Sequence, residues 1–409
     1  MDFNDSPEEA LFRQTCHEWL ASQATLKENN VALSFATLAD KVAASRRWQN
    51  MKASAGYGAI TWPKQYGGMG GSPLQNIIFR QEEAKFLVPP SQFNVSLGMV
   101  IPSLMAHANE DIKARHIAPA LYGDELWCQL LSEPQAGSDL GMIRTKAVRC
   151  DDGRDGWIIN GQKVWTSLAQ FAEFGMVLTR TNPDVHSFAG MTAFFIDMKS
   201  PGVDIKPIVQ ANGHQEFNEV FLSDVYVPDS QRVGEIDSGW LVTMTALNSE
   251  RMSIGGLVPD NLIEHVINQL KSLGEEMHDP ALLTRLNQLY LKAHGLWLMQ
   301  CQGMTALSKG QMPSAGLGTA KIIACEVLSE YAQLMFDLRG HEGILSPRAI
   351  DEHWSVIEDL WYGAAGMRIA GGTDEIVKNG IGERVLGLPP EPRTDKGKTF
   401  RELTERTLA

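Results

Sequence analysis

Cysteine is scarce in this chain of 409 residues, and its few copies follow no recognisable pattern. The five cysteines are scattered, odd in number and never arranged as Cys-x-x-Cys. Neither a disulfide framework nor a zinc site is therefore suggested. A reducing compartment fits this usage best. The acidic N-terminus lacks the basic start of a secretory signal, so we expect a cytoplasmic protein.

Long apolar runs and an excess of positive charge are missing as well. No apolar stretch approaches the length that spans a bilayer. The formal net charge is −13, which opposes the basic face that nonspecific binding of nucleic acid requires. Neither a membrane nor a nucleic acid is therefore an expected partner. An acidic chain can still bind an anionic cofactor, because phosphates are held locally by backbone N–H groups and a few side chains.

Several common signatures of catalysis and nucleotide binding are also absent. The chain contains no His-Glu-x-x-His, no Gly-x-Ser-x-Gly and no phosphate-binding Gly-x-x-x-x-Gly-Lys-Ser/Thr. Its ten histidines show no ligand spacing, so no metal is predicted. The nearest match to a dinucleotide fingerprint, Gly316-Leu317-Gly318, lacks the third glycine and opens a helical segment. A Rossmann fold is therefore disfavoured.

The chain does contain three successive regimes of composition. Residues 1–126 read mostly as helices, and the first follows Ser6, a residue that favours the start of a helix. Residues 127–237 are rich in β-branched and aromatic residues. The helical period returns from residue 238 onward. This order is not the βαβ alternation of a parallel sheet.

Local patterns sharpen this outline. Asn160-Gly161 lies between two β-prone runs and predicts a hairpin. Apolar residues at helical spacing from Leu262 to Leu270 predict a helix with one buried face. Further long helical patterns cover about 280–308 and 317–338. The sequence therefore predicts a compact antiparallel β domain between two helical regions.

Two motifs more than half the chain apart carry a resemblance to a known family. Ser132-Glu133-Pro134-Gln135-Ala136-Gly137-Ser138-Asp139 resembles the Thr/Ser-Glu-Pro-x-Ala-Gly-Ser-Asp loop of the acyl-CoA dehydrogenases. Residues 372–387 resemble the Gly-Thr-x-Glu-Ile…Glu-Arg-Val-Leu-Gly close of the same family. The octamer alone would also suit a turn between domains. Gln162-Lys163-Val164-Trp165-Thr166-Ser167, which resembles the Trp-x-Thr/Ser edge beside the flavin, favours the functional interpretation.

The resemblance implies an α+β multidomain fold. It would comprise an N-terminal α-helical domain (1–126), a central antiparallel β domain (127–237) and a C-terminal four-helix bundle with a tail (238–409). FAD would lie between the β domain and the bundle and be completed by a second subunit. The expected assembly is a homodimer or homotetramer. Around Lys271-Ser272-Leu273-Gly274-Glu275 the family's Arg-x-x-Phe-Gly segment is not recognisable, so the contacts at the adenine end of FAD stay open.

The resemblance also implies individual site residues. Matching positions that contact FAD are Leu131, Ser132, Ser138, Trp165, Ser167, Thr373 and Glu375. Ser138 also matches a position near the thiol arm of CoA. Arg251 matches another position near CoA, although an ion pair within or between helices is an equally good interpretation.

The catalytic base is the sharpest question. Dehydrogenation of a thioester needs a carboxylate, desolvated so that its pKa rises, to take the α-proton. Many family members carry that glutamate where this chain has Gly371. A second branch, which includes isovaleryl-CoA dehydrogenase, places it immediately before an arginine on an early helix of the C-terminal domain. Glu250-Arg251 fits this pattern, so Glu250 is the predicted base. A surface glutamate near a helix terminus is the alternative.

The resemblance to the family also suggests a role for Gly371 and Gly372. A backbone N–H there can donate to the thioester carbonyl, because no side chain blocks its approach. Two glycines also leave room for a branched or bulky acyl group, although straight and steroid-like groups stay open. The predicted function is FAD-dependent α,β-dehydrogenation of an acyl-CoA, with electrons passed to an electron-transfer flavoprotein. The alternatives are a catalytically silent or partner-dependent subunit of a hetero-oligomer, and an oxidase or monooxygenase that uses O₂.

Overall fold

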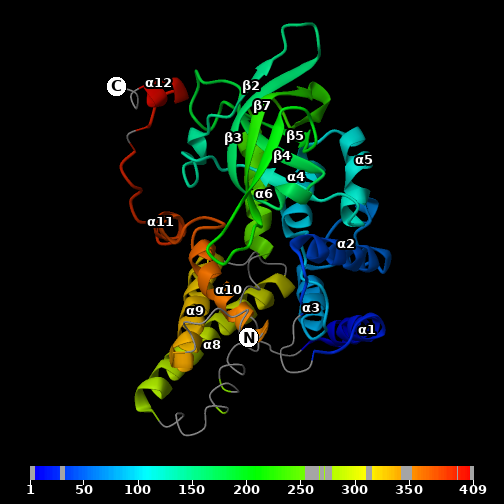
Figure 1. Cartoon of the computed structure of the whole chain (residues 1–409), viewed down its shortest axis with the longest axis vertical. Coiled ribbons are helices and arrows are strands. Elements are labelled where there is room, and N and C mark those ends of the chain that lie inside the picture. Colours follow the sequence, from blue (N-terminus) through cyan, green and yellow to red (C-terminus); the bar gives the residue numbers. More distant parts are fainter. Residues whose placement is uncertain are drawn as a thin grey trace. The chain divides into compact units, whose positions relative to one another are not determined.

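The computed structural model describes residues 5–27, 33–253, 267, 271, 279–309, 316–341, 352–393 and 395–405. The chain divides into two compact units, each assembled from segments that are distant in sequence (Figure 1). The helical unit consists of Met1–Ser34, Pro73–Val88 and Arg251–Pro390, and the sheet unit of Phe35–Ser72, Pro89–Glu250 and Glu391–Ala409. The two units are described separately below.

An eight-stranded sheet forms the centre of the sheet unit, with the strand order β6-β7-β3-β2-β4-β5-β8 and β1 paired with β4. Most neighbouring strands are antiparallel, whereas β1 and β2 run parallel to β4. The strands are β1 (Trp127–Leu130), β2 (Lys146–Arg149), β3 (Gly156–Ser167), β4 (Phe174–Arg180), β5 (Met191–Asp197), β6 (Val203–Ile208), β7 (Phe217–Pro228) and β8 (Arg232–Val233).

The hairpin predicted at Asn160-Gly161 is wrong, because β3 passes straight through it as one strand. The pairing of β3 with β7 shifts register between Ile159 and Gly161. Asn160 Nδ2 donates to Asp224 Oδ1 at 2.9 Å, and Asp224, with φ 52°, donates its N–H to Asn160 Oδ1 at 2.9 Å. Between Ile159 and Gly161 strand β3 advances by two residues, whereas β7 advances by three, from Val225 to Leu222. The extra residue of this β-bulge therefore lies in β7, opposite Asn160.

Both faces of the central strands are buried, and alternate residues belong to two different cores. Trp127, Met176 and Phe195 pack in a cluster that also contains residues of the helices. Their neighbours in sequence, including Cys128 and Val177, pack in a second cluster within the sheet. This double burial explains the near-continuous apolar run over β5. The helices of this unit are α2 (Leu38–Ser54), α4 (Ile101–His107), α5 (Glu110–Leu121), α6 (Gly239–Ser253) and α12 (Phe400–Glu405).

The C-terminal segment of the chain belongs to the sheet unit. Residues 389–393 have no regular structure, and helix α12 follows at Phe400. Phe400 is buried, and its ring lies 4.1 Å from the guanidinium carbon of Arg180. Arg401 forms an ion pair with Asp184 at 2.6 Å. The polar tail thus ends in a short helix that packs on the sheet.

The helical unit contains α1 (Pro7–Gln23), α3 (Pro73–Glu83), α8 (Pro280–Ser308), α9 (Gly316–Arg339), α10 (Glu352–Met367) and α11 (Asp374–Arg384). The bounds of α8 and α9 confirm the two long helices predicted from the sequence. Of the apolar face predicted between Leu262 and Leu270 the structure describes Ile267, which is helical and 37% exposed. The other residues of that face lie outside the described residues. Leu289 of α8, Leu328 of α9 and Ile357 of α10 share one core.

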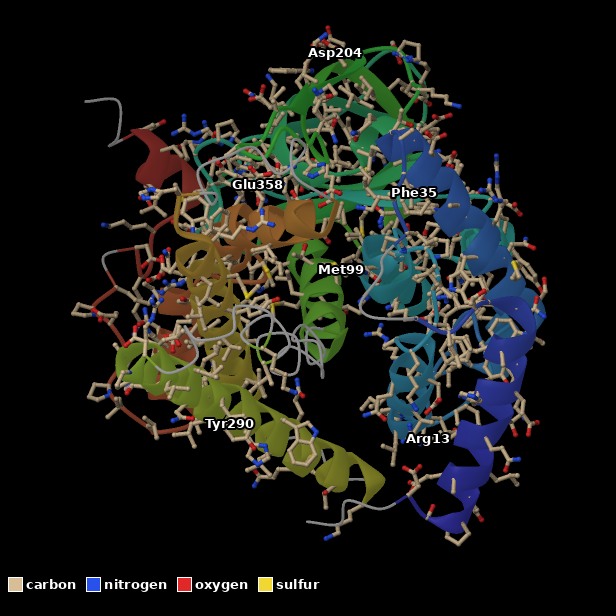
Figure 2. The ribbon with its side chains drawn as sticks, turned by 60° about the horizontal axis from the view of Figure 1, so that its bottom comes forward. Arg13, Phe35, Met99, Asp204, Tyr290 and Glu358 are labelled. Atoms are coloured by element: carbon tan, nitrogen blue, oxygen red, sulfur yellow. The ribbon has the colours of Figure 1, made fainter. Side chains whose placement is uncertain are left out.

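Capping and a buried ion pair define the first helices of this unit. Ser6 and Glu9 form a capping box at the start of α1, as the sequence predicts. Arg13 of α1, labelled in Figure 2, donates to the buried carboxylate of Glu82 on α3 at 3.1 Å. This contact joins two residues that are 69 positions apart in the sequence.

Candidate active site

The octamer loop that follows β1 is closed by two backbone hydrogen bonds. Glu133 N–H donates to Ala136 O at 2.9 Å, and Ala136 N–H donates back to Glu133 O at 3.0 Å. Leu131 and Glu133 are buried, whereas Ser138 is exposed. Ser138 therefore lies on the exposed side of the loop, whereas Leu131 and Glu133 fix the start of the loop in the protein interior.

The loop is anchored by a buried ion pair between Lys163 and Glu133. The ammonium of Lys163 is fully buried and donates to Glu133 Oε1 at 2.9 Å, to Leu131 O at 3.0 Å and to Leu178 O at 2.7 Å. The carboxylate also accepts the backbone N–H groups of Arg144, at 2.6 Å, and Thr145, at 2.9 Å. All three donors of the ammonium are used.

Electrostatics fix the charge state of this pair. Burial raises the pKa of Glu133, but the charge of Lys163 and the hydrogen bonds to the carboxylate outweigh it, so the pKa lies below its usual value. Burial lowers the pKa of Lys163, and the neighbouring carboxylate opposes that shift. The carboxylate form of Glu133 is thus favoured wherever the lysine is protonated.

The C-terminal end of β3, which carries the predicted flavin residues Trp165 and Ser167, is joined to the same loop. Val164 N–H donates to Ser132 O at 3.0 Å, which ties β3 to the octamer. The register of β3 against β7 shifts between Lys163 and Thr166. Trp165 lies inside this irregularity with φ 60° and a side chain that is 59% exposed. A large non-glycine residue in this conformation is strained, and such strain is concentrated at functional sites.

The residues gathered here fit the polar and aromatic needs of a flavin. Ser132 and Ser167 supply hydroxyl groups, and Trp165 supplies an exposed aromatic wall. Within the part of the chain that the structure describes, the buried atoms Gln129 Oε1 and Thr166 Oγ1 have no hydrogen-bond partner. Gln129 lies in β1, which leads into the octamer loop, and Thr166 lies in β3 between Trp165 and Ser167.

The second motif forms a turn between α10 and α11 in the helical unit. Gly371 and Gly372 have φ of 67° and 94°, which glycine adopts without steric cost. Thr373 is the N-cap of α11 and accepts the N–H of Ile376 at 3.2 Å. Among the described residues, no acceptor faces the backbone N–H of Gly371 or Gly372. The turn therefore presents two N–H groups that no acceptor in the described part of the chain engages.

The remaining predicted site residues are Glu375 and the pair Glu250-Arg251, which differ in what the structure describes of them. Glu375 is exposed, and hydrogen bonds from its own N–H and from the Thr373 hydroxyl lower its pKa. Glu250 and Arg251 lie in the last turn of α6. Their side chains lie outside the described residues, so their roles stay predictions.

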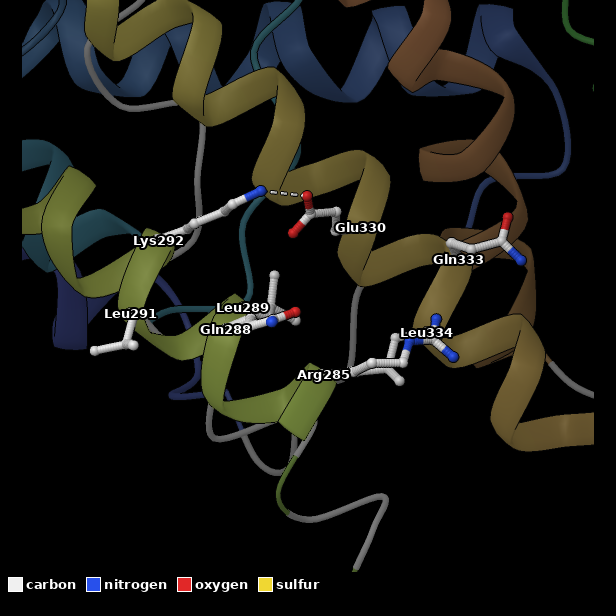
Figure 3. A pocket seen from close by; sticks show the side chains of 8 residues that line it. All are labelled: Arg285, Gln288, Leu289, Leu291, Lys292, Glu330, Gln333 and Leu334. Atoms are coloured by element: carbon white, nitrogen blue, oxygen red, sulfur yellow. Dashed lines mark hydrogen bonds and ion pairs between the residues drawn. The ribbon is translucent and has the colours of Figure 1, made fainter. Parts of the chain in front are cut away.

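A cavity in the helical unit contains none of the predicted site residues. It lies along α8 and α9, has a volume of about 560 Å³ and is crossed by an ion pair between Lys292 and Glu330 (Figure 3). In the described part of the chain, no cluster of three or more His, Cys, Asp or Glu side chains could hold a metal ion. Among the same residues, no helix is long and apolar enough to cross a membrane.

Models of three acyl-CoA dehydrogenase domains match successive parts of the chain. The N-terminal domain model matches residues 6–124, the middle domain model 128–225 and the C-terminal domain model 237–386. The chain belongs to the acyl-CoA dehydrogenase family. The predicted fold, with helical, antiparallel β and helical parts, is confirmed, as is the class of oxidoreductase. The predicted FAD cofactor is confirmed by solved structures of the same fold, such as the FAD complex of PigA, with a TM-score of 0.72 and 20% identity.

Individual relatives agree with this assignment. Acyl-CoA dehydrogenase IpdE1 of Mycobacterium tuberculosis is 31% identical over 395 residues, which cover 93% of this chain and 98% of that protein. Acyl-CoA dehydrogenase FadE34 of the same organism is 36% identical over 338 residues, covering 82% of this chain. The match covers 45% of FadE34, so the chain spans about half the length of that relative.

Solved structures share the fold over nearly the whole chain. The ChsE4-ChsE5 complex from Mycobacterium tuberculosis has a TM-score of 0.78 and 25% identity, and covers 95% of this chain and 100% of that one. The Tcur3481-Tcur3483 steroid ACAD has a TM-score of 0.79 and 24% identity, with 96% and 100% covered.

Sequence reasoning gave no role to the two residues that fix the octamer loop. Lys163 and Glu133 both stand within the quoted motifs, but they are 30 positions apart. A signal was present, because Ile159, Gly161 and Lys163 follow the inward period of β3. A charged residue at a buried strand position requires a partner of opposite charge.

Proposed function

We propose that the enzyme removes the α and β hydrogens of an acyl-CoA thioester and yields a trans-2-enoyl-CoA. The observation that carries the proposal is the Gly371-Gly372 turn, which has no side chain and two backbone N–H groups free of acceptors among the described residues. FAD, when bound, supplies the acceptor for the β-hydrogen. The chain supplies the base, the donors to the carbonyl and the walls that hold both reactants.

The Gly371-Gly372 turn acts on the thioester carbonyl. As the α-proton leaves, negative charge develops on the carbonyl oxygen, and preoriented N–H donors stabilise that charge. The turn also precedes α11, an 11-residue helix whose N-terminus carries partial positive charge. Its position therefore suits an oxygen that becomes negative during the reaction.

Glu250 takes the α-proton in this proposal. Gly371 occupies the position at which many family members carry the base, and glycine has no group to do so. Glu250 directly precedes Arg251, as in the second branch of the family. A positioned carboxylate contributes about 10²- to 10⁴-fold to such a proton transfer. Arg251 and Ser138 then contact the CoA arm.

The cofactor residues act through position. Leu131, Ser132 and Ser138 contact FAD from the octamer loop, Trp165 and Ser167 flank the ring, and Thr373 and Glu375 contact it from the start of α11. The anchoring of the octamer loop supports this assignment, since Lys163 donates to both Leu131 O and the carboxylate of Glu133.

We propose a branched or bulky acyl group as substrate. Two glycines at the turn leave space where a side chain would project. Cyclohexane-1-carbonyl-CoA dehydrogenase of Syntrophus aciditrophicus, 32% identical over 198 residues, is named for a cyclic acyl group. The electrons would pass to an electron-transfer flavoprotein, and the chain would form a homo-oligomer with domains at 1–126, 127–237 and 238–409.

The test is anaerobic bleaching of the purified flavoprotein by straight, branched and steroid acyl-CoAs. We expect one class to bleach the wild type, and Glu250→Gln to bind that class but bleach at least about 10²-fold more slowly. The matched control is Glu235→Gln, since the Glu235 side chain is 89% exposed. Bleaching of Glu250→Gln at the wild-type rate would exclude Glu250 as base.

A partner-dependent subunit is the second candidate. Two observations favour it: a chain of similar fold occurs in the ChsE4-ChsE5 complex, and the Arg-x-x-Phe-Gly segment is not recognisable here. A measurement of mass, flavin content and activity of the chain purified alone separates the candidates. A yellow, active homo-oligomer excludes the partner-dependent subunit, and rapid reoxidation in air would indicate an oxidase.

A further inference from the structure

A lysine of α9 is buried beneath the Gly371-Gly372 turn. The Lys321 residue is 6% exposed, and its ammonium donates to Gly372 O at 2.9 Å, to Arg368 O at 3.1 Å and to Asp374 Oδ1 at 3.3 Å. An ammonium group has three donors, so each is used. Two of them bind backbone carbonyls that stand on either side of the turn.

Asp374, the first residue of α11, completes the connection. It is 2% exposed and accepts Arg368 Nε at 2.7 Å in addition to Lys321. Its N–H donates to Arg368 O at 3.1 Å, the same carbonyl that Lys321 binds. The two ends of the turn are therefore joined through one lysine and one carboxylate.

These bonds restrict a segment that would otherwise be free. Glycine loses more conformational freedom on folding than any other residue, and here two are adjacent. With Arg368 O and Gly372 O both held by Lys321, the peptide groups between them are confined. Their N–H groups meet no acceptor among the described residues, so the confinement does not consume them.

The local charge also suits an oxyanion. Asp374 alone would place a negative charge beside the turn and oppose the charge that develops on a carbonyl oxygen. Lys321 and Arg368 both contact its carboxylate, at 3.3 Å and 2.7 Å. The two cations compensate this carboxylate, so Asp374 itself does not oppose a negative charge that develops nearby.

We infer that Lys321, together with Asp374, is a positioning residue that directs the Gly371 and Gly372 N–H groups at the thioester carbonyl. The anchoring of the turn stands on the contacts alone, whereas the identity of the acceptor rests on the proposed function. Lys321 itself does not touch the substrate in this scheme and acts through the backbone that it holds.

The first test measures hydrogen exchange without any ligand. Lys321→Met removes all three bonds of the ammonium, and Arg368→Gln serves as the matched control because it weakens the pairing of Asp374 but leaves Lys321 on Gly372 O. We expect the N–H of Asp374, which donates to Arg368 O, to exchange at least about tenfold faster in Lys321→Met only. Unchanged exchange would overturn the inference, even if no acyl-CoA proved to be a substrate.

The second test asks whether the anchored turn acts on the carbonyl. The infrared frequency of an isotope-labelled thioester carbonyl in bound enoyl-CoA reports hydrogen bonds to it. In Lys321→Met we expect a smaller shift of that frequency, with kcat reduced roughly tenfold to a hundredfold and KM nearly unchanged. Faster exchange with wild-type carbonyl frequency and kcat would show a structural role only and overturn the positioning role.

A variant that fails to fold would not report on the turn. In that case the double variant Lys321→Met/Asp374→Asn replaces the single one, because it removes the buried charges together and leaves no uncompensated carboxylate. The same two measurements apply. If none of the acyl-CoAs bleaches the flavin of the wild type, the proposed function fails. The exchange experiment still decides whether Lys321 anchors the turn.

Discussion

Each unit of this enzyme buries one lysine beneath a predicted active-site loop, and the two lysines differ in how much depends on them. Lys163 and Lys321 each donate to two backbone carbonyls and one carboxylate. Glu133, however, has no second cationic side chain in contact among the described residues, whereas Asp374 also binds Arg368, whose side chain is 48% exposed. The carboxylate beneath the Gly371-Gly372 turn therefore keeps a cationic partner if its lysine is removed, whereas the carboxylate beneath the octamer loop does not.

The largest effect should follow from removal of the unsupported lysine. Lys163→Met leaves the Glu133 carboxylate buried without a contacting cation, which we expect to cost about 3–5 kcal/mol of unfolding free energy. Lys321→Met should cost less, roughly 1–3 kcal/mol, because Arg368 still pairs with Asp374. Denaturant unfolding of both variants measures the difference. Equal losses of unfolding free energy in the two variants would show that Arg368 does not compensate for the missing lysine.

Acid should separate the same two sites. The pKa of Glu133 lies below its usual 4.5, so its charge stabilises the fold above that pH, and the contribution is lost as the pH falls from there toward the folded-state value. Each unit of difference corresponds to about 1.4 kcal/mol. In thermal unfolding between about pH 5 and 3, Glu133→Gln should be less stable than the wild type at the upper end and show a shallower slope.

Asp374 provides the control for that experiment. Burial raises the pKa of Asp374, but hydrogen bonds from Arg368 and Lys321 hold it below its usual 3.8. Its contribution has the same sign and begins to be lost only as the pH falls through 3.8, compared with 4.5 for Glu133. An unchanged slope in Glu133→Gln would show that other carboxylates dominate acid unfolding.

The smallest effect should come from the cap beside the turn. Thr373→Ala removes the bond from Ile376 N–H, which we expect to cost about 1 kcal/mol. Hydrogen exchange should rise at Ile376, while the bonds of Lys321 persist. Ser6→Ala, at the cap of α1, is the matched control for loss of a capping hydroxyl elsewhere in the same unit. A larger loss for Thr373→Ala than for Lys321→Met would reverse the proposed order of importance.

The helices named here were predictable because their signals are local. The cap at Ser6 and the long periodic segments at α8 and α9 predicted elements that the structure contains. The continuation of β3 through Asn160-Gly161 was not predictable in the same way. Asn-Gly favours a tight turn when neighbours allow it, but here the pairing of β3 with β7 continues on both sides of the dipeptide.

The strained Trp165 shows the same limit. Its residue type suggested an aromatic wall beside the flavin, whereas its positive φ and its exposure follow from the irregular pairing with β7. No local sequence signal predicts a left-handed tryptophan, because the conformation is disfavoured by its own backbone. Only the surrounding sheet holds it there.

By itself, the sequence determined the family, the order of helical and β regions, the two motif loops and the absence of a carboxylate at Gly371. These follow from residue types and short spacings. The tertiary structure alone decided which charges lie beneath the loops. Lys163 and Glu133 are 30 positions apart, and Lys321 and Asp374 are 53 apart. A buried ion pair forms only when packing removes both partners from water and brings them together, and no local pattern encodes that distance.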